Sequence, residues 1–288
     1  MKDVQYYAPD TLKDALRLLG KHGARIRVLA GGTDLVRNMN LEFTVPDNIL
    51  WIGKLGLEYI RRDEGLLHIG AATRMQTAGA SKLLQDKATA LAQAAGKMAA
   101  PPVRSLATLG GNICNASPAA DSVCAMIALG AEIVLTSARG SRVVALDKFF
   151  TGPGKTVMKP GEMLTEIRIR PTAKGEGSAY AKVGRRQALT LAVLNAAARV
   201  RLDGHGACAD VRIAIGAAAP TPVRAVRAEA LLRGQPFTHE AIARAAEQAV
   251  AEIHPIDDVH GTAWYRRKLT RVLVARVLAR AGGLGEGA

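Results

Sequence analysis

The chain has 288 residues, of which 49% are hydrophobic and 22% are charged, so it can bury a core and is not expected to be disordered. Aromatic residues make up only 4%, which argues against a module that binds single-stranded nucleic acid by stacking bases on rings. No run of about 18 uncharged apolar residues occurs, and the opening MKDVQYYAPD lacks the apolar segment of a signal peptide. We therefore expect a cytoplasmic protein without a membrane span.

The net charge of +14 is spread along the chain rather than collected in a basic tail. A solvated basic surface is the plain interpretation, and an anionic ligand or an acidic protein partner is the alternative. The cysteines Cys114, Cys124 and Cys208 show no metal-binding spacing, and the histidines form no HxH or HExxH motif. We expect reduced thiols and no metal site on this chain.

The first part of the chain reads as alternating helices and strands. Leu12, Ala15, Leu16 and Leu19 form one apolar stripe, which predicts a helix over 10–22 with Asp10 as its N-cap. A strand at 25–29 ends in the glycine turn AGGTD at 30–34, and a helix follows at 34–40. Further on, the sequence predicts strands at 49–52 and 66–70, and one helix over 82–99 that Pro101 and Pro102 stop.

A long loop rich in Gly, Asn, Ser and Pro is expected at 104–121, followed by a buried helix at 122–130. Residues 131–136 and 142–146 predict a hairpin. A Pro/Gly cluster at 152–161, with Pro171, indicates a boundary. Beyond it we expect a small α+β unit, with strands near 178–183, 195–202 and 207–216 and helices at 224–233, 238–252 and 262–281.

Two glycine loops carry the chemistry. In Ala30-Gly31-Gly32-Thr33-Asp34, paired glycines after a strand leave backbone N–H groups free to face an anion, although many such turns are purely structural. Thr108-Leu109-Gly110-Gly111-Asn112 repeats the pattern, and Ser117 and Asp121 follow. Two such loops fit a long diphosphate ligand gripped from two sides, with Asp121 suited to a sugar or ribityl hydroxyl.

The sequence does not match the motifs of other nucleotide-binding and catalytic sites. The stretch around Gly154-Lys155-Thr156 ends like a P-loop, but Phe149 stands where the first glycine is required and Pro153 interrupts the loop. There is no GxGxxG fingerprint of a Rossmann fold. No nucleophile–base arrangement is visible in the sequence, so we expect a cofactor carrier without catalytic residues of its own.

Residues AGGTDL at 30–35 and ATLGGNICNASPAAD at 107–121 resemble the two FAD loops of the FAD-binding (medium) subunits of molybdenum hydroxylases, the xanthine dehydrogenase family. The resemblance extends over nearly the whole chain, through YYAPDTLKDAL at 6–16, FFTGPGKTVMKPGEML at 149–164, Ala181-Lys182-Val183 with Arg185-Arg186, and Tyr265-Arg266-x-x-Leu269. It implies an α+β fold. A two-subdomain FAD-binding domain at 1–172, of the PCMH type, divides near residue 56. A C-terminal domain at 173–288 has a three-stranded antiparallel sheet and helices.

The resemblance also implies the residues that hold FAD. In the first loop they are Leu29, Ala30, Gly31, Gly32, Thr33, Asp34 and Leu35. In the second loop they are Thr108, Gly111, Asn112, Asn115, Ser117 and Asp121. Two more, Leu164 and Lys182, lie further along the chain. Lys182 would be a cation near the flavin or the ribityl chain. Met98 stands where xanthine oxidoreductases have an aromatic residue. One branch of the family carries an inserted four-cysteine loop for an extra [4Fe–4S] cluster, and this chain has neither the insert nor enough cysteines.

The implied function is electron transfer. A molybdopterin-containing large subunit would oxidise the substrate, and a small subunit with [2Fe–2S] clusters would pass the electrons to FAD on this chain. An acceptor such as NAD or a quinone would then receive them, in an assembly of two three-subunit units. Two alternatives stay open at this stage: a stand-alone flavin-dependent oxidoreductase, and a basic binding or scaffold protein without a cofactor.

Overall fold

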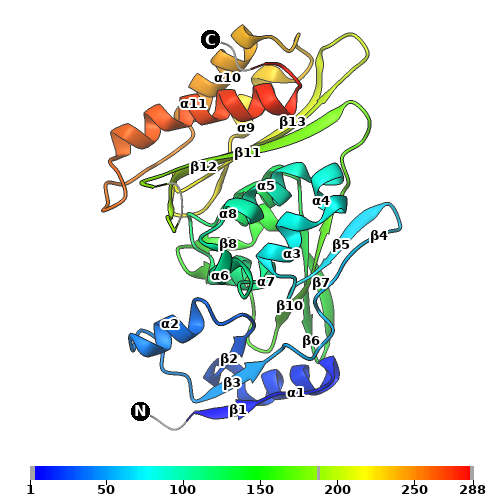
Figure 1. The fold of residues 1–288 in the computed structure, drawn as a ribbon, viewed down its shortest axis with the longest axis vertical. Coiled ribbons are helices and arrows are strands. Elements are labelled where there is room, and N and C mark those ends of the chain that lie inside the picture. The colour runs from blue at the N-terminus through cyan, green and yellow to red at the C-terminus, as the bar shows by residue number, and fades with distance from the viewer. Residues whose placement is uncertain (1–3, 187–188, 286–288) are drawn as a thin grey trace.

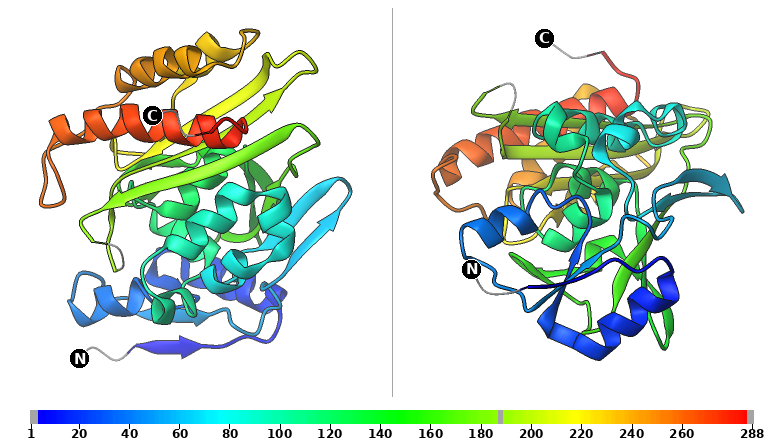
Figure 2. Two further views of the ribbon diagram at one scale, coloured as in Figure 1. Left: turned by 45° about the horizontal axis from the view of Figure 1, so that its top comes forward. Right: turned by 60° about the horizontal axis from the view of Figure 1, so that its bottom comes forward.

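The structure is a computed structural model that describes residues 4–186 and 189–285, and its elements form three stacked layers (Figures 1 and 2). The first layer is a parallel sheet in the order β1-β3-β2, made of β1 (Gln5–Tyr7), β3 (Asn48–Trp51) and β2 (Ile26–Leu29). Helix α1 (Leu12–His22) buries its predicted apolar stripe there, and α2 (Leu35–Asn40) follows the first glycine loop.

The middle layer is a five-stranded sheet with helices on one side. The strand order is β4-β5-β10-β6-β7, and all of its pairs are antiparallel. The strands are β4 (Ile60–Asp63), β5 (Leu66–Gly70), β6 (Glu132–Ser137), β7 (Gly140–Ala145) and β10 (Met163–Ile169). The helices are α3 (Met75–Ala80), α4 (Lys82–Lys87), α5 (Thr89–Lys97), α6 (Pro101–Arg104), α7 (Leu109–Asn115) and α8 (Asp121–Ala128), and a small hairpin consists of β8 (Phe150–Gly152) and β9 (Lys155–Thr156).

The third layer is an antiparallel sheet covered on both faces. Its strands are β11 (Glu176–Gly184), β12 (Ala192–Leu202), β13 (Cys208–Gly216) and the two-residue β14 (Val223–Arg224). Helices α9 (Val226–Leu232), α10 (His239–Val250) and α11 (Ala263–Ala281) cover one face. The other face meets the helices of the middle layer, with Tyr180, Ala197 and Ala214 buried in their core. β14 is one strand more than the three-stranded sheet we expected.

Side chains alternate across β12, so each of its faces serves a different core. Leu194, Ala196 and Ala198 pack toward α10 and α11, whereas Asn195 and Ala197 point toward α8 of the middle layer. Because the strand is buried on both faces for most of its length, its sequence is largely apolar over that length and shows no alternation of polar and apolar residues there. The C-terminal sheet is thus in direct contact with the segment that leads into α8.

Four local predictions were wrong. The N-cap of α1 is Thr11, whose hydroxyl accepts from the N–H of Asp14, while Asp10 pairs with Lys54 at 3.1 Å. The expected helix over 82–99 is two helices, because the N–H of Ala90 is bonded to the Ser178 hydroxyl of β11 and α5 starts anew there.

The prolines, moreover, begin a helix instead of ending one. Helix α5 ends at Lys97, and Pro101 and Pro102 open α6, since a proline in the first helical turn loses no hydrogen bond. The expected loop over 104–121 also contains the helix α7. Within the described residues, no helix is long and apolar enough to cross a membrane.

Candidate functional site

A cavity of about 1040 Å³ lies where the first glycine loop, the second glycine loop and the C-terminal sheet meet. All of the residues predicted to hold a cofactor line it, except Leu29 and Lys182. Leu29 ends β2, where its carbonyl accepts from the N–H of Ile52, so it anchors the first loop from behind. Leu164, the second residue of β10, lines the cavity as predicted. The two loops, at 30–34 and 108–112 of the sequence, therefore meet at one site.

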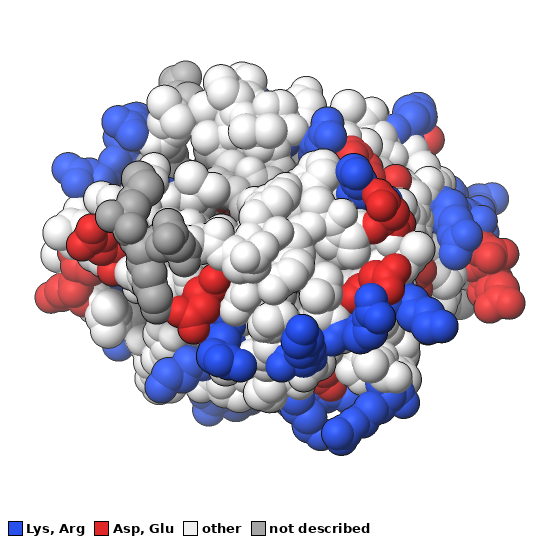
Figure 3. All heavy atoms as spheres, turned by 90° about the horizontal axis from the view of Figure 1, so that it is seen from below, with Lys and Arg blue, Asp and Glu red and all other residues white. Residues whose placement is uncertain are grey.

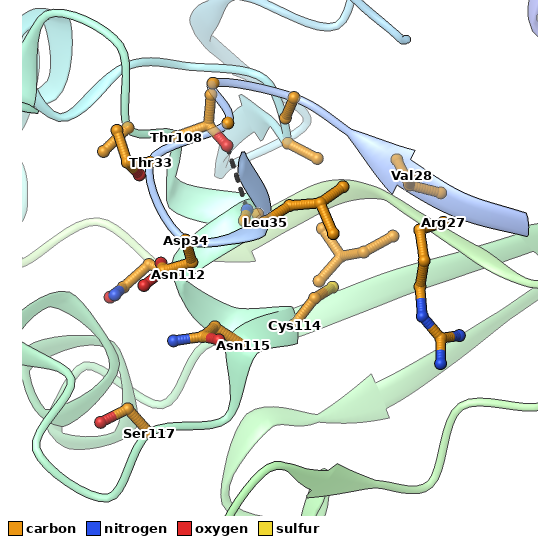
Figure 4. A pocket seen from close by; sticks show the side chains of 18 of the residues that line it. Arg27, Val28, Thr33, Asp34, Leu35, Thr108, Asn112, Cys114, Asn115 and Ser117 are labelled. Carbon is orange, nitrogen blue, oxygen red and sulfur yellow. Dashed lines mark hydrogen bonds between the residues drawn. The ribbon is translucent and has the colours of Figure 1, made fainter. Parts of the chain in front are cut away.

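The first loop offers backbone donors. Within the described residues, the N–H groups of 31–34 donate no hydrogen bond to another protein group. Gly32 has a φ of +74°, a conformation that glycine adopts without strain. Gly31 is in close contact with the second loop, because a Cβ built there would lie 1.8 Å from the carbonyl oxygen of Leu106. Figure 4 shows Thr33 and Asp34 at the tip of this loop.

The second loop uses its backbone differently from our expectation. The N–H groups of Leu109 and Gly110 are bonded to carbonyls of the β5–α3 connection, and that of Gly111 is bonded to the Thr108 hydroxyl at 3.0 Å, which makes Thr108 the N-cap of α7. The paired glycines thus serve packing and capping. What this loop presents to the cavity is a set of side chains, Asn112, Asn115 and Ser117 (Figure 4).

The orientation of Asn112 is fixed by a neighbour. Its Oδ1 accepts a hydrogen bond from the Ser122 hydroxyl at 2.7 Å. Because the carbonyl oxygen of the amide is engaged there, the NH₂ group is the part that remains for a ligand. The second loop therefore offers an amide donor where the first loop offers backbone N–H groups.

Asp121 is held by the C-terminal sheet. Its Oδ2 accepts from Lys182 Nζ at 2.7 Å, and its Oδ1 accepts from the Tyr180 hydroxyl at 2.5 Å and from Asn195 Nδ2 at 3.2 Å. Burial, together with the nearby Asp121 charge, raises the pKa of Tyr180 well above its ordinary value, so the hydroxyl stays protonated as the donor. Asp121 lines the cavity, but both of its oxygens already have protein donors.

The charged groups at the cavity are nearly balanced. Among the described lining residues, Arg27 and Lys159 are basic, and Asp34, Asp121 and Glu162 are acidic. Burial raises the pKa of Asp34, with Arg37 opposing it. Hydrogen bonds from Arg142, at 2.7 and 2.8 Å, hold the pKa of Glu162 below its usual value.

Sequence reasoning missed several parts of the cavity wall. The segment between β9 and β10 contributes residues 158–162, and Met163 follows as the first residue of β10. The connection between β11 and β12 contributes Leu189, Thr190 and Leu191. Cys114 of α7 and Arg27 of β2 also line it. Residues 158–163 and Cys114 lie inside the stretches at 149–164 and 107–121 that carry the resemblance but were not named as site residues. Arg27 and residues 189–191 lie outside any motif and reach the site through the tertiary fold. Met98, noted for its place in the family pattern, does line the cavity.

Comparison with known proteins agrees with this geometry. Residues 2–172 match the family model described as the FAD binding domain in molybdopterin dehydrogenase, and residues 178–281 match the CO dehydrogenase flavoprotein C-terminal domain. The chain is 34% identical over 275 residues to the carbon monoxide dehydrogenase medium chain of Hydrogenophaga pseudoflava, with 95% of each chain covered. It is 36% identical over 246 residues to the nicotinate dehydrogenase FAD-subunit of Eubacterium barkeri, with 83% of each covered.

Solved structures give the same result. Carbon monoxide dehydrogenase from Hydrogenophaga pseudoflava has a TM-score of 0.93 at 36% identity, with 97% of both chains covered. Quinoline 2-oxidoreductase from Pseudomonas putida 86 has a TM-score of 0.91 at 27% identity, with 98% of this chain and 99% of that chain covered. The chain is therefore an oxidoreductase subunit that belongs to the family of FAD-binding domains of molybdopterin dehydrogenases, followed by a CO dehydrogenase flavoprotein C-terminal domain.

Proposed function

We propose that this chain holds FAD in the cavity between its two glycine loops and passes electrons from [2Fe–2S] clusters of a partner subunit, through FAD, to an external acceptor such as NAD or a quinone. The observation that carries this proposal is the meeting of both loops at one cavity of about 1040 Å³. That volume is at the upper end of the range for ligand pockets, which suits a dinucleotide.

The donors at the cavity fit the chemistry of FAD. The free N–H groups of 31–34 suit the diphosphate, because backbone dipoles can solvate an anion without a cation. The amide of Asn112, the amide of Asn115 and the hydroxyl of Ser117 suit the polar groups of the rest of the cofactor. We propose the fifteen residues named from the resemblance as the site, with Leu29 and Lys182 acting from behind the wall.

When bound, FAD supplies the redox chemistry, accepting electrons and releasing them as a pair. The chain itself binds and orients it. Gly31 keeps the two loops at contact distance, Thr108 fixes the start of α7, and the C-terminal sheet closes one side through Leu189–Leu191. We also propose the division into domains at 1–172 and 173–288, because the chain passes from the middle to the third layer between β10 and β11. The proposed subdomains meet near residue 56, between β3 of the first layer and β4 of the middle layer.

The partners are proposed from the relatives. Curated relatives are named as a medium chain or an FAD-subunit, and one solved structure is described as lacking the Mo-pyranopterin moiety of its molybdenum cofactor. We infer that this chain works in the cytoplasm with a molybdopterin-binding large subunit and a [2Fe–2S] small subunit, in an (αβγ)₂ assembly. The substrate would then be chosen by the large subunit.

The first test is an absorption spectrum of the purified chain, followed by release and identification of the chromophore. Flavin bands and about one FAD per chain support the proposal, and a colourless chain that takes up no added FAD, with or without partner subunits, refutes it. Turnover of a small organic substrate with dioxygen by the isolated chain, without partner subunits, would favour a stand-alone flavin enzyme. A scaffold without a cofactor predicts salt-dependent binding to nucleic acid. The face in Figure 3 has an uncharged centre, with basic groups along its lower rim and acidic groups mainly at its two sides.

A further inference from the structure

The C-terminal sheet directs three polar side chains at one point of the cavity wall. Tyr180 and Lys182 are two residues apart on β11, so they share a face, and Lys182 pairs with Asn195 of β12 in the antiparallel register. All three side chains contact Asp121, the first residue of α8. These partners come from 59 to 74 residues further along the chain.

The ion pair at the centre of this group is buried. The side chain of Lys182 is 7% exposed and that of Asp121 is 6% exposed. A buried charge without a partner is costly, so each of the two groups depends on the other. With Lys182 engaged by the carboxylate, the pair carries no net charge beside the cavity. This differs from the sequence expectation, in which Lys182 acts as a single cation toward the cofactor.

The same group also attaches the cavity wall to the C-terminal sheet. Asn195 Nδ2 donates to the carbonyl of Ala119 at 3.3 Å, and the N–H of Ala217 donates to the carbonyl of Pro118 at 2.8 Å. Asn195 is completely buried, and its amide is oriented by two acceptors, the Ala119 carbonyl and Asp121. The segment 117–121, which lines the cavity through Ser117 and Asp121, is therefore fixed from the other domain.

We propose that Tyr180, Lys182 and Asn195 are positioning residues that hold Asp121, and that Lys182 also neutralises its charge, so that the C-terminal sheet sets both the geometry of this wall and the electrostatic field at the bound cofactor. The inference rests on the proposed function, since it concerns the same cavity. It assigns Lys182 a role as the counter-ion of Asp121, and it gives Tyr180 and Asn195 a part in cofactor binding that does not require contact with the cofactor.

The direction in which each variant changes the midpoint potential of FAD follows from the charge that the substitution leaves unpaired. Reduction adds negative charge to the site, so a bare cation favours the reduced cofactor and a bare anion disfavours it. Asp121→Asn leaves Lys182 unpaired and should raise the midpoint potential. Lys182→Met leaves Asp121 unpaired and should lower it. The double variant carries neither charge and should return close to the wild-type potential.

The experiment measures the midpoint potential of FAD and its dissociation constant in the full chain, with partner subunits present if they are needed for uptake. We expect each single variant to change the ratio of affinities for reduced and oxidised FAD about tenfold, in opposite directions, which is about 30 mV for a two-electron couple. If Lys182 instead contacts the cofactor directly, the midpoint potential of the double variant should stay as low as that of Lys182→Met. That result, or unchanged potentials in all three variants, overturns the inference.

Tyr180→Phe keeps both charges and the buried ring, so it tests the positioning role by itself even where a charge variant does not fold. We expect its affinity for FAD to fall about tenfold while its potential stays near wild type, and unchanged affinity would contradict the role. The matched control is the exposed pair Lys82 and Asp86, at 2.8 Å on α4, whose Met and Asn variants should move neither value. If the wild-type chain binds no FAD, the proposed function fails first. If it does bind FAD and the variants behave as wild type, only this inference fails.

Discussion

Gly31→Ala is the substitution that the structure predicts to separate the two loops. The added Cβ would lie 1.8 Å from the Leu106 carbonyl oxygen and 2.5 Å from its carbon, and Cβ atoms are not found within 3.0 Å of such neighbours. Both partners are backbone, so no side-chain rotation relieves the clash. One loop must move by at least about 1 Å. Overpacking of this kind costs roughly 1–3 kcal/mol, and if that cost falls on the bound form, FAD affinity drops about 5- to 150-fold.

The assay is titration of the chain with FAD, followed by flavin fluorescence, together with thermal unfolding of each variant. The control is the same substitution at Gly20, an exposed position in α1 with nothing within 4 Å of the added Cβ. Because glycine in a helix interior costs about 0.5–1 kcal/mol relative to alanine, Gly20→Ala should stabilise the chain slightly and leave FAD binding unchanged. A Gly31→Ala chain that binds FAD with wild-type affinity would refute the close-contact reasoning.

Three further outcomes are expected. Thr108→Ala removes the N-cap of α7, so it should lower the free energy of unfolding by about 1 kcal/mol and weaken FAD binding. The control Thr238→Ala removes the N-cap of the distant α10 and should cost a similar amount without affecting FAD binding. An equal loss of FAD affinity in both variants would contradict this prediction. Arg142 lowers the pKa of Glu162, so the ion pair stabilises the fold above the ordinary carboxylate pKa and loses this effect as the pH falls. The melting temperature of Arg142→Met should therefore lie further below that of wild type at about pH 7 than at about pH 3. An equal difference in melting temperature at both pH values would count against this prediction. Cys114 is the exposed thiol at the cavity, so FAD should slow its reaction with a maleimide, and labelling at the same rate with FAD present would place the cofactor elsewhere.

Much of the fold could be predicted where one face of an element determines its pattern. The stripe of α1 and the long strands β11, β12 and β13 were found close to their true bounds. The helix α7 was missed because Gly110 and Gly111 lie in its first turn, and glycine has low helix propensity. The break between α4 and α5 depends on the Ser178 hydroxyl. That contact comes from 88 residues away, so no local window of the sequence contains it.

The site, like the fold, could be predicted where the local sequence determines the geometry and not where tertiary packing does. The loop at 30–35 was correct as a local unit, because the strand before it and the glycines within it determine its geometry. Asp121 lines the cavity, and its role toward a ligand hydroxyl stays a prediction, but nothing in the sequence indicates that both of its oxygens already accept from protein donors. Its three donors lie on β11 and β12, and they are brought to it only when the third layer packs on the middle one. Lys182 was likewise predicted near the site, but its engagement by a carboxylate was not foreseen.

The high net charge of the chain does not reside in the cavity, and this bears on how an anion is held there. The described lining residues include two basic and three acidic side chains, although the chain as a whole carries +14. Of the acids, Asp121 and Glu162 are each paired with a cation. A diphosphate would therefore be held by oriented backbone N–H groups, whose partial charges belong to the fold and stay fixed over the working pH range. In such a site, neutralising Asp121 matters more than adding a cation, because an unpaired carboxylate would oppose both the bound anion and its reduction.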